Sequence, residues 1–312
     1  MKSKTGNLFR STICLLLLVV TVAGCGFLHK KQTSQRLFQS SFFTPVKSFI
    51  SPEGPAVDRA GILYAVNYDH KGTIGQIFPD GQGKIFIELS NKSIGNGIRF
   101  SSAGDMFIAD YINHAILKVN MASGSVSIFA HEPRMSQPND IAIDHKDRLY
   151  ASDPDFKKGT GKIWRIDTEG KIFLLDSTLG TANGIEVSPH DKTLYVNETA
   201  QRKVWAYDLS PQGEISNKRL LIEFPDFGMD GMRCDAKGNL YITRYGKGTV
   251  VKVSPEGKVL QEITLIGKDP TNLTFGGKDG RTVYVTVKDN GNIESFLVGD
   301  PGLQWMPKSS KD

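Results

Sequence analysis

The chain has 312 residues, with 38 lysines and arginines against 33 aspartates and glutamates. Three of the basic residues, Lys2, Lys4 and Arg10, lie at the extreme N-terminus, so the rest of the chain is close to neutral. Nucleic acid binding needs a basic footprint, and we therefore exclude that class of partner.

The first 24 residues have the pattern of a bacterial export signal. After the positive start, residues 13–22 are apolar but too few for an ordinary membrane span. The following VAGC sequence resembles a lipobox, in which cleavage would leave Cys25 as a lipid-modified first residue; an ordinary secretory signal is the alternative. We predict a lipoprotein signal peptide over residues 1–24 and a lipid-anchored polar tether over residues 25–44.

This signal also predicts where the protein resides and how its cysteines are used. Gly26 follows Cys25 in place of the Asp associated with inner-membrane retention, so we expect the cell envelope, with the outer membrane or cell surface favoured. Cys14 leaves with the signal, and Cys234 is then the one unmodified cysteine. We expect no disulfide and a buried Cys234.

From about residue 45 the sequence repeats one phrase six times. Each copy opens on a short polar step, at intervals of 42 to 47 residues, and continues with alternating apolar residues, a polar turn and further strand-like runs. Such a period is typical of a β-propeller. We predict an all-β, six-bladed propeller with four-stranded blades over residues 45–298 and a polar tail over residues 299–312. The steps are Glu53-Gly54, Asn96-Gly97, Asn139-Asp140, Asn183-Gly184, Asp230-Gly231 and Asn272-Leu273.

The sixth copy lacks a fourth strand, because the chain becomes polar after Val298. Residues 45–50 (PVKSFI) precede the first copy and could supply the missing strand. We therefore predict that an N-terminal strand closes the ring.

The first residue of each step carries the candidate chemistry. Equivalent positions of successive blades converge on the axis of a radial fold, and Glu53, Asn139, Asn183 and Asp230 would bring two carboxylates and two amide oxygens together. This all-oxygen set favours Ca²⁺ over softer metals. Without a metal the two carboxylates would repel, and one pKa would rise. Asn also starts strands for turn reasons alone, an interpretation that fits the second and sixth copies.

The EGP, PND, ANG and DGM steps, with SPHDKTLYV after the ANG step, resemble the SMP-30/gluconolactonase/LRE family over about residues 48–298. Members are six-bladed propellers, mostly Ca²⁺- or Zn²⁺-dependent hydrolases of sugar lactones, and some cleave organophosphates. The resemblance implies that Glu53, Asn183 and Asp230 are metal ligands. It also implies that Asn139 binds substrate and, in some members, the metal.

The resemblance implies a metal-dependent hydrolase of a lactone or related small ester, in which Asp230 is the catalytic residue, either as general base or as direct nucleophile. We expect a monomer with Ca²⁺, or alternatively Zn²⁺. One departure concerns the substrate: Gln137 stands two residues before Asn139, where animal gluconolactonases have Arg.

Two other functions stay open. A non-catalytic binding propeller on the bacterial envelope is the first, because Asn113-His114 within ADYINHAILKV is similar to NHL-repeat propellers. The second is a strictosidine-synthase-like propeller, which requires a catalytic Glu that we cannot align here.

Overall fold

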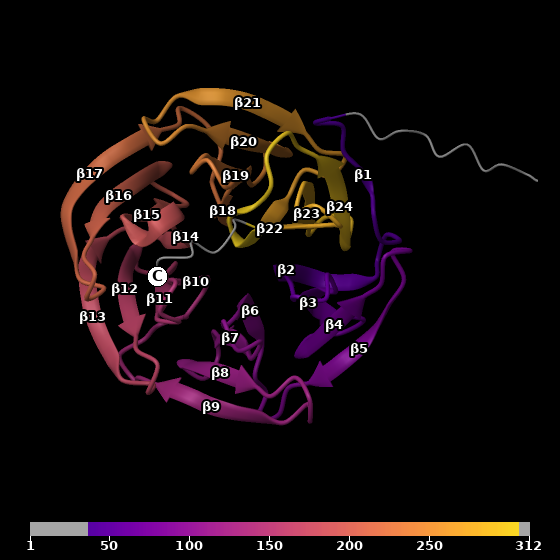
Figure 1. The fold of residues 1–312 in the computed structure, drawn as a ribbon, viewed down its shortest axis with the longest axis horizontal. Coiled ribbons are helices and arrows are strands. Elements are labelled where there is room, and N and C mark those ends of the chain that lie inside the picture. Colours follow the sequence, from indigo (N-terminus) through magenta and orange to yellow (C-terminus); the bar gives the residue numbers. More distant parts are fainter. Residues whose placement is uncertain (1–36, 306–312) are drawn as a thin grey trace, which may run out of the picture. The chain divides into compact units, whose positions relative to one another are not determined.

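The computed structural model describes residues 37–305, so the predicted signal peptide and Cys25 lie outside the described residues. Within this range six antiparallel sheets of four strands are arranged around a central axis (Figure 1). We call the region along this axis, which side chains occupy, the channel. The first strand of each sheet lies nearest the axis and the last lies at the circumference (Figure 1). The predicted six-bladed propeller is therefore confirmed.

The blades follow one another along the chain. The first contains β2 (Phe49–Val57), β3 (Leu63–Tyr68), β4 (Thr73–Ile77) and β5 (Gly83–Glu88), and the second β6 (Gly95–Phe100), β7 (Met106–Asp110), β8 (Ala115–Val119) and β9 (Val126–His131). The third and fourth contain β10 (Ile141–Ile143), β11 (Leu149–Asp155), β12 (Thr160–Ile166), β13 (Ile172–Leu179), β14 (Ala182–Val187), β15 (Thr193–Glu198), β16 (Lys203–Leu209) and β17 (Ile215–Glu223). The last two contain β18 (Met232–Cys234), β19 (Leu240–Arg244), β20 (Thr249–Val253), β21 (Val259–Thr264), β22 (Pro270–Gly276), β23 (Thr282–Val287), β24 (Asn292–Leu297) and β1 (Ser41–Phe42).

Burial decreases from the axis outward. Every residue of β14 is buried, whereas most of β17 in the same blade is exposed. The apolar clusters join neighbouring blades; Ile98 of the second blade, for example, packs with Val66 of the first. The remaining regular elements are two 3₁₀ turns, η1 (Pro189–Asp191) and η2 (Leu303–Trp305), and no helix within residues 37–305 could span a membrane.

An N-terminal strand does close the ring, but it is not the one that the sequence predicts. Strand β1 pairs with β24, and Ser40 Oγ donates a hydrogen bond to Glu294 Oε2 at 2.7 Å. The predicted segment, residues 45–50, instead turns and enters the inner strand β2 at Phe49. The reason is packing: the Phe49 side chain is buried and its ring lies edge-on against that of Tyr68. An inner-strand position buries this ring, whereas an outer strand would expose it.

Candidate metal centre

All six inner strands begin at the same end of the channel, which we call the mouth. Backbone bonds connect the repeat positions of neighbouring blades there: Gly97 N donates to the carbonyl of Asn139 at 2.8 Å, and Gly184 N to that of Asp230 at 3.0 Å. The repeat positions therefore form a ring of adjacent residues around the axis, as the sequence predicts for equivalent positions.

The sixth position of this ring is Thr271, not Asn272. Gly231 N donates to the carbonyl of Thr271 at 2.7 Å, in the pattern of the other blades. Asn272 thus takes the place that Gly has in most copies, one residue deeper. There is room for its side chain because the neighbour is Gly231, where a Cβ would lie 2.0 Å from Asn272 Oδ1.

Glu53 and Asp230 meet across the mouth, where the carboxyl group of Glu53 contacts that of Asp230. Both side chains are half-buried. Desolvation by the surrounding protein raises the pKa of Glu53 to about 7, and desolvation together with the charge of Glu53 raises the pKa of Asp230 well above its usual range. Both pKa values move in the direction expected for converging carboxylates, with burial as the largest cause.

Of the two predicted amide ligands, Asn183 contacts Asp230, whereas the side chain of Asn139 bonds to another amide. Asn183 donates hydrogen bonds to Asp230 and, at 3.0 Å, to Thr199 Oγ1, while its own Oδ1 is buried without a hydrogen-bond partner. Asn139 Oδ1 accepts a bond of 3.0 Å from Nδ2 of Asn96, a residue of the preceding blade. A buried carbonyl oxygen beside a carboxylate pair fits a metal ligand, since an unsatisfied acceptor is costly.

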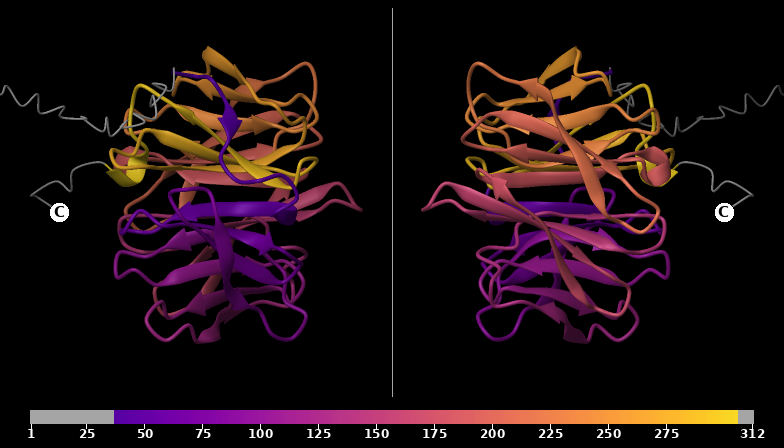
Figure 2. Two further views of the ribbon diagram at one scale, coloured as in Figure 1. Left: turned by 90° about the vertical axis from the view of Figure 1, so that its right-hand side faces the viewer. Right: turned by 90° about the vertical axis from the view of Figure 1, so that its left-hand side faces the viewer.

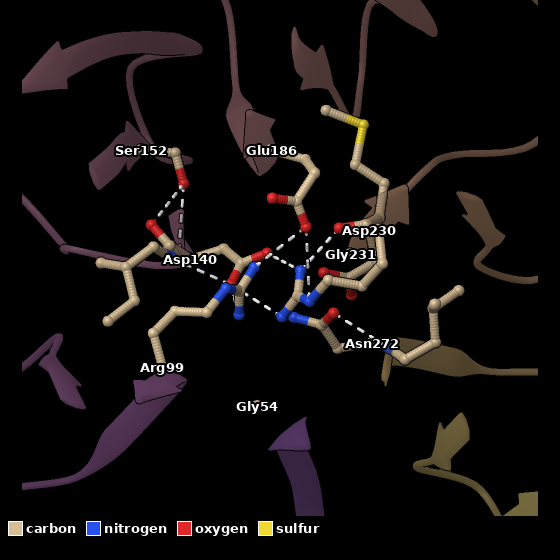
Figure 3. A network of polar contacts seen from close by, with 12 residues as sticks. Gly54, Arg99, Asp140, Ser152, Glu186, Asp230, Gly231 and Asn272 are labelled. Carbon is tan, nitrogen blue, oxygen red and sulfur yellow. Dashed lines mark hydrogen bonds and ion pairs between the residues drawn. The ribbon is translucent and has the colours of Figure 1, made fainter. Parts of the chain in front are cut away.

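Sequence reasoning missed a second group of charges deeper in the channel. Arg233 Nη1 donates to Asp140 Oδ2 at 2.8 Å, and Arg99 Nη1 lies 3.6 Å from Asp140 Oδ1. Arg99 Nη2 lies 3.7 Å from Glu186 Oε2, and all four side chains are buried. Figure 3 shows Arg99 and Glu186 pointing toward Asp140 at the centre of this network. The signal was present, because Arg99, Glu186 and Arg233 each follow the first residue of a step by three positions.

The charges of the channel do not cancel. Four carboxylates (Glu53, Asp140, Glu186 and Asp230) face two guanidinium groups, Arg99 and Arg233. Arg233 and Arg99 lower the pKa of Asp140 although burial alone would raise it, so this carboxylate is charged. With all four carboxylates ionised, the excess of two negative charges would match one divalent cation, and the donors at the mouth are all oxygens. Within residues 37–305, no group of three or more His, Cys, Asp or Glu side chains is arranged to hold a metal ion. The predicted ligand set differs from such a group, because only two of its four members are acidic and the other two are Asn.

The remaining candidates have local roles. Asp110 Oδ1 accepts the N–H groups of Ile112 and Asn113 and so caps the turn that contains the NHL-like step. At Gln137 the backbone N–H donates to Asp153 Oδ1 at 2.6 Å. Cys234 is free and buried, as expected.

Known proteins resemble the chain in sequence and in fold. Gluconolactonase of Zymomonas mobilis is 26% identical over 62% of this chain and 61% of its own length, and 6-deoxy-6-sulfogluconolactonase of Pseudomonas putida is 31% identical over 48% and 54%. The chain thus spans about three fifths of the length of the first relative and about half of the length of the second. The crystal structure of regucalcin, a calcium-binding protein from Agrobacterium tumefaciens, superimposes with a TM-score of 0.73 at 21% identity, covering 86% of this chain and 95% of that one. The model of the SMP-30/Gluconolactonase/LRE-like region matches residues 51–289, and the chain belongs to this family.

Proposed function

We propose that this chain is a metal-dependent hydrolase that opens a lactone or a related small ester at the channel mouth. The observation that carries the proposal is the contact between Glu53 and Asp230 in a channel whose carboxyl groups outnumber its guanidinium groups by two. A divalent cation would balance the charges of the ionised carboxylates and relieve their repulsion. The lactonases among the relatives indicate the class of substrate.

The cation would be held by Glu53, Asn139, Asn183 and Asp230. Hard oxygen donors favour Ca²⁺, with Zn²⁺ as the alternative, and the resemblance to regucalcin, a calcium-binding protein, supports this order. When bound, the cation would polarise the lactone carbonyl and stabilise the negative charge that develops on its oxygen.

The side chains at the mouth would have separate roles in the reaction. Asp230 would take a proton from the attacking water or attack the carbonyl carbon itself, and both routes need its carboxylate unprotonated. Two contacts fix its position: Asn197 Nδ2 donates to its backbone carbonyl at 2.6 Å, and Asn183 donates to its carboxylate. Asn139 would hold the substrate. Its neighbour Gln137 offers an amide where the animal gluconolactonases have a charge, so sugar acids and other lactones are both candidates.

A panel of lactones and simple esters, assayed with chelator and then with Ca²⁺ or Zn²⁺, tests the proposal. We expect hydrolysis only with metal and its loss in Asp230→Ala. Asp269→Asn is the matched control, because Asp269 lies on the mouth side in the connection before β22 but outside the metal set. Full activity of Asp230→Ala would contradict the role of this residue. If no substrate were hydrolysed with either metal, the protein would be a non-catalytic binding propeller.

We further propose that Cys25 anchors the protein to the bacterial envelope. The support is the VAGC sequence that ends an export signal. Incorporation of labelled palmitate into the full chain, and its absence in Cys25→Ser, is the expected result. Equal labelling of both chains would contradict it.

A further inference from the structure

Large exposed apolar side chains are unevenly distributed between the two ends of the propeller. Six of them lie in or beside the connections at the mouth, from five of the six blades, and each is 40% to 49% exposed. The connections at the opposite end contain none within residues 38–305; the others lie on outer strands, with Leu37 at the start of the described chain. The six are Val46, Ile50, Ile112, Phe156, Phe227 and Ile266.

The topology places these residues on one side of the molecule. Inner strands start at the mouth, so the connections between blades and the turns between second and third strands all lie there. Backbone bonds join them: Lys47 N donates to the carbonyl of Asn290, and Leu265 N to that of Gly248. Figure 2 shows the β11–β12 hairpin, which carries Phe156, projecting from the side opposite η2. We call these six residues the apolar rim.

Basic side chains accompany the apolar rim. Excluding the two channel residues Asp140 and Asp230, Lys and Arg outnumber Asp and Glu in the connections of the mouth, whereas the acidic residues outnumber the basic ones in the connections of the opposite end. Lys47, Lys92 and Lys268 are exposed, and none of them forms an ion pair within the described residues. Their ammonium groups are therefore available to an anionic partner.

We infer that the mouth side docks on an anionic lipid bilayer. Apolar side chains at loop tips can enter the boundary between headgroups and acyl chains, while lysines between them pair with anionic headgroups. A protein partner would instead be expected to cover a continuous apolar patch with a polar rim. Here the apolar residues are distributed around a channel. The net charge of the loops at the other end is negative, opposite to that at the mouth, and this difference orients the molecule in the electric field of the bilayer.

The predicted anchor is compatible with this orientation. Leu37 pairs with Leu297 at the end away from the mouth. The chain between Cys25 and Leu37 can extend about 40 Å, and the chain from Leu37 to Val46 reaches the mouth in about 30 Å. The lipid and the apolar rim can therefore reach the same bilayer. Docking would place the channel mouth at the headgroup layer.

Vesicle binding by residues 26–312 tests the inference, since this segment retains every strand of the propeller and lacks Cys25. We expect co-sedimentation with phosphatidylcholine vesicles that contain phosphatidylglycerol, much weaker binding to pure phosphatidylcholine, and loss at high salt. The rim variant Phe156→Ser/Phe227→Ser/Ile266→Ser is expected to lower the partition coefficient at least about tenfold, a change of about 1.4 kcal/mol.

The control variant Leu174→Ser/Leu220→Ser/Leu260→Ser removes residues of similar exposure from the outer strands β13, β17 and β21. It should bind like the parent. Thermal unfolding of both triple variants checks that they are folded. If a triple variant unfolds at a lower temperature than the parent, its three single variants are tested for vesicle binding in its place. No binding by the parent, or equal loss in both triples, would overturn the inference. So would an effect of the rim variant confined to the KM for lactones with an acyl chain, which would identify the rim as a contact for the substrate's tail.

Discussion

Glu53 of the first blade and Asp230 of the fifth meet across the channel mouth, with their carboxyl groups in contact. The contact is unfavourable when both are charged. Desolvation and the charge of Asp140 raise the pKa of Glu53, and desolvation and the charge of Glu53 raise that of Asp230. Asn272 and Asn183 each donate a bond to one of the two carboxyl groups, which holds them face to face. Such a pair costs folding free energy when both groups are charged, and under the proposed function a bound cation would offset that cost.

Asp230→Asn should stabilise the metal-free protein while it abolishes metal binding. The amide keeps the shape of the side chain and removes a desolvated charge, which is worth on the order of 1–3 kcal/mol. We expect a melting temperature a few degrees higher in chelator and no further rise with Ca²⁺. Asp269→Asn should behave like the parent in both conditions. A lower melting temperature in chelator together with a retained Ca²⁺ response would contradict the proposed role.

The stability of the metal-free protein should fall as the pH rises from about 5 to 8. Raised pKa values mean that folding favours the protonated carboxyl groups; their contribution is complete below the unfolded pKa and is lost as the pH passes through the folded value, about 7 for Glu53. Protons compete with the cation, so the rise in melting temperature on adding Ca²⁺ should be larger at pH 8 than at pH 6. Thermal unfolding at both values, with and without chelator, measures this. A Ca²⁺ response that grows as the pH falls would be inconsistent with the pair.

The sequence predicts the blades well because each blade is built from consecutive strands joined by short turns. The strand that closes the ring of blades is harder to predict. It is β1, which contains only Ser41–Phe42, and two residues are too few to show an alternating pattern. The burial of Phe49, which decides that the predicted segment belongs to an inner strand, depends on Tyr68 packing against it. Such a contact between strands is not readable from one strand alone.

The candidate site was predictable only in its outer layer. Glu53 and Asp230 stand out because acidic residues replace Asn at the repeat position. Thr271 was missed because the register of β22 depends on the bond from Gly231 N to its carbonyl. Arg233 shares with Arg99 and Glu186 its place three positions after a step, but only the fold shows that it lies beside Asp140.

Arg233→Met should destabilise the protein strongly, by about 3–5 kcal/mol, because it leaves Asp140 and Glu186 buried with one cation in place of two. The double variant Arg233→Met/Asp140→Asn removes both charges of the pair and should recover part of the loss. Urea unfolding of the parent, the two single variants Arg233→Met and Asp140→Asn, and the double variant gives the coupling free energy between the two residues. Arg233→Lys keeps the charge but not the two bonds to Asp140, and we expect an intermediate cost. Strict additivity of the two single substitutions would show that the deep network is not coupled.

Removal of residues 37–42 should weaken ring closure without separating the blades. The deletion removes β1 and the Ser40–Glu294 bond and leaves β24 as an exposed edge. The first and last blades stay joined by Thr271 Oγ1, which donates to the carbonyl of Pro52 at 2.7 Å, and by Thr44 Oγ1, which accepts the N–H of Ile293. Each lost hydrogen bond is worth about 1 kcal/mol, so we expect the free energy of unfolding to fall by about 2–4 kcal/mol. The transition should stay cooperative and occur at a lower temperature. A chain that begins at residue 37 is the control, and identical melting of the two chains would mean that β1 contributes nothing to closure.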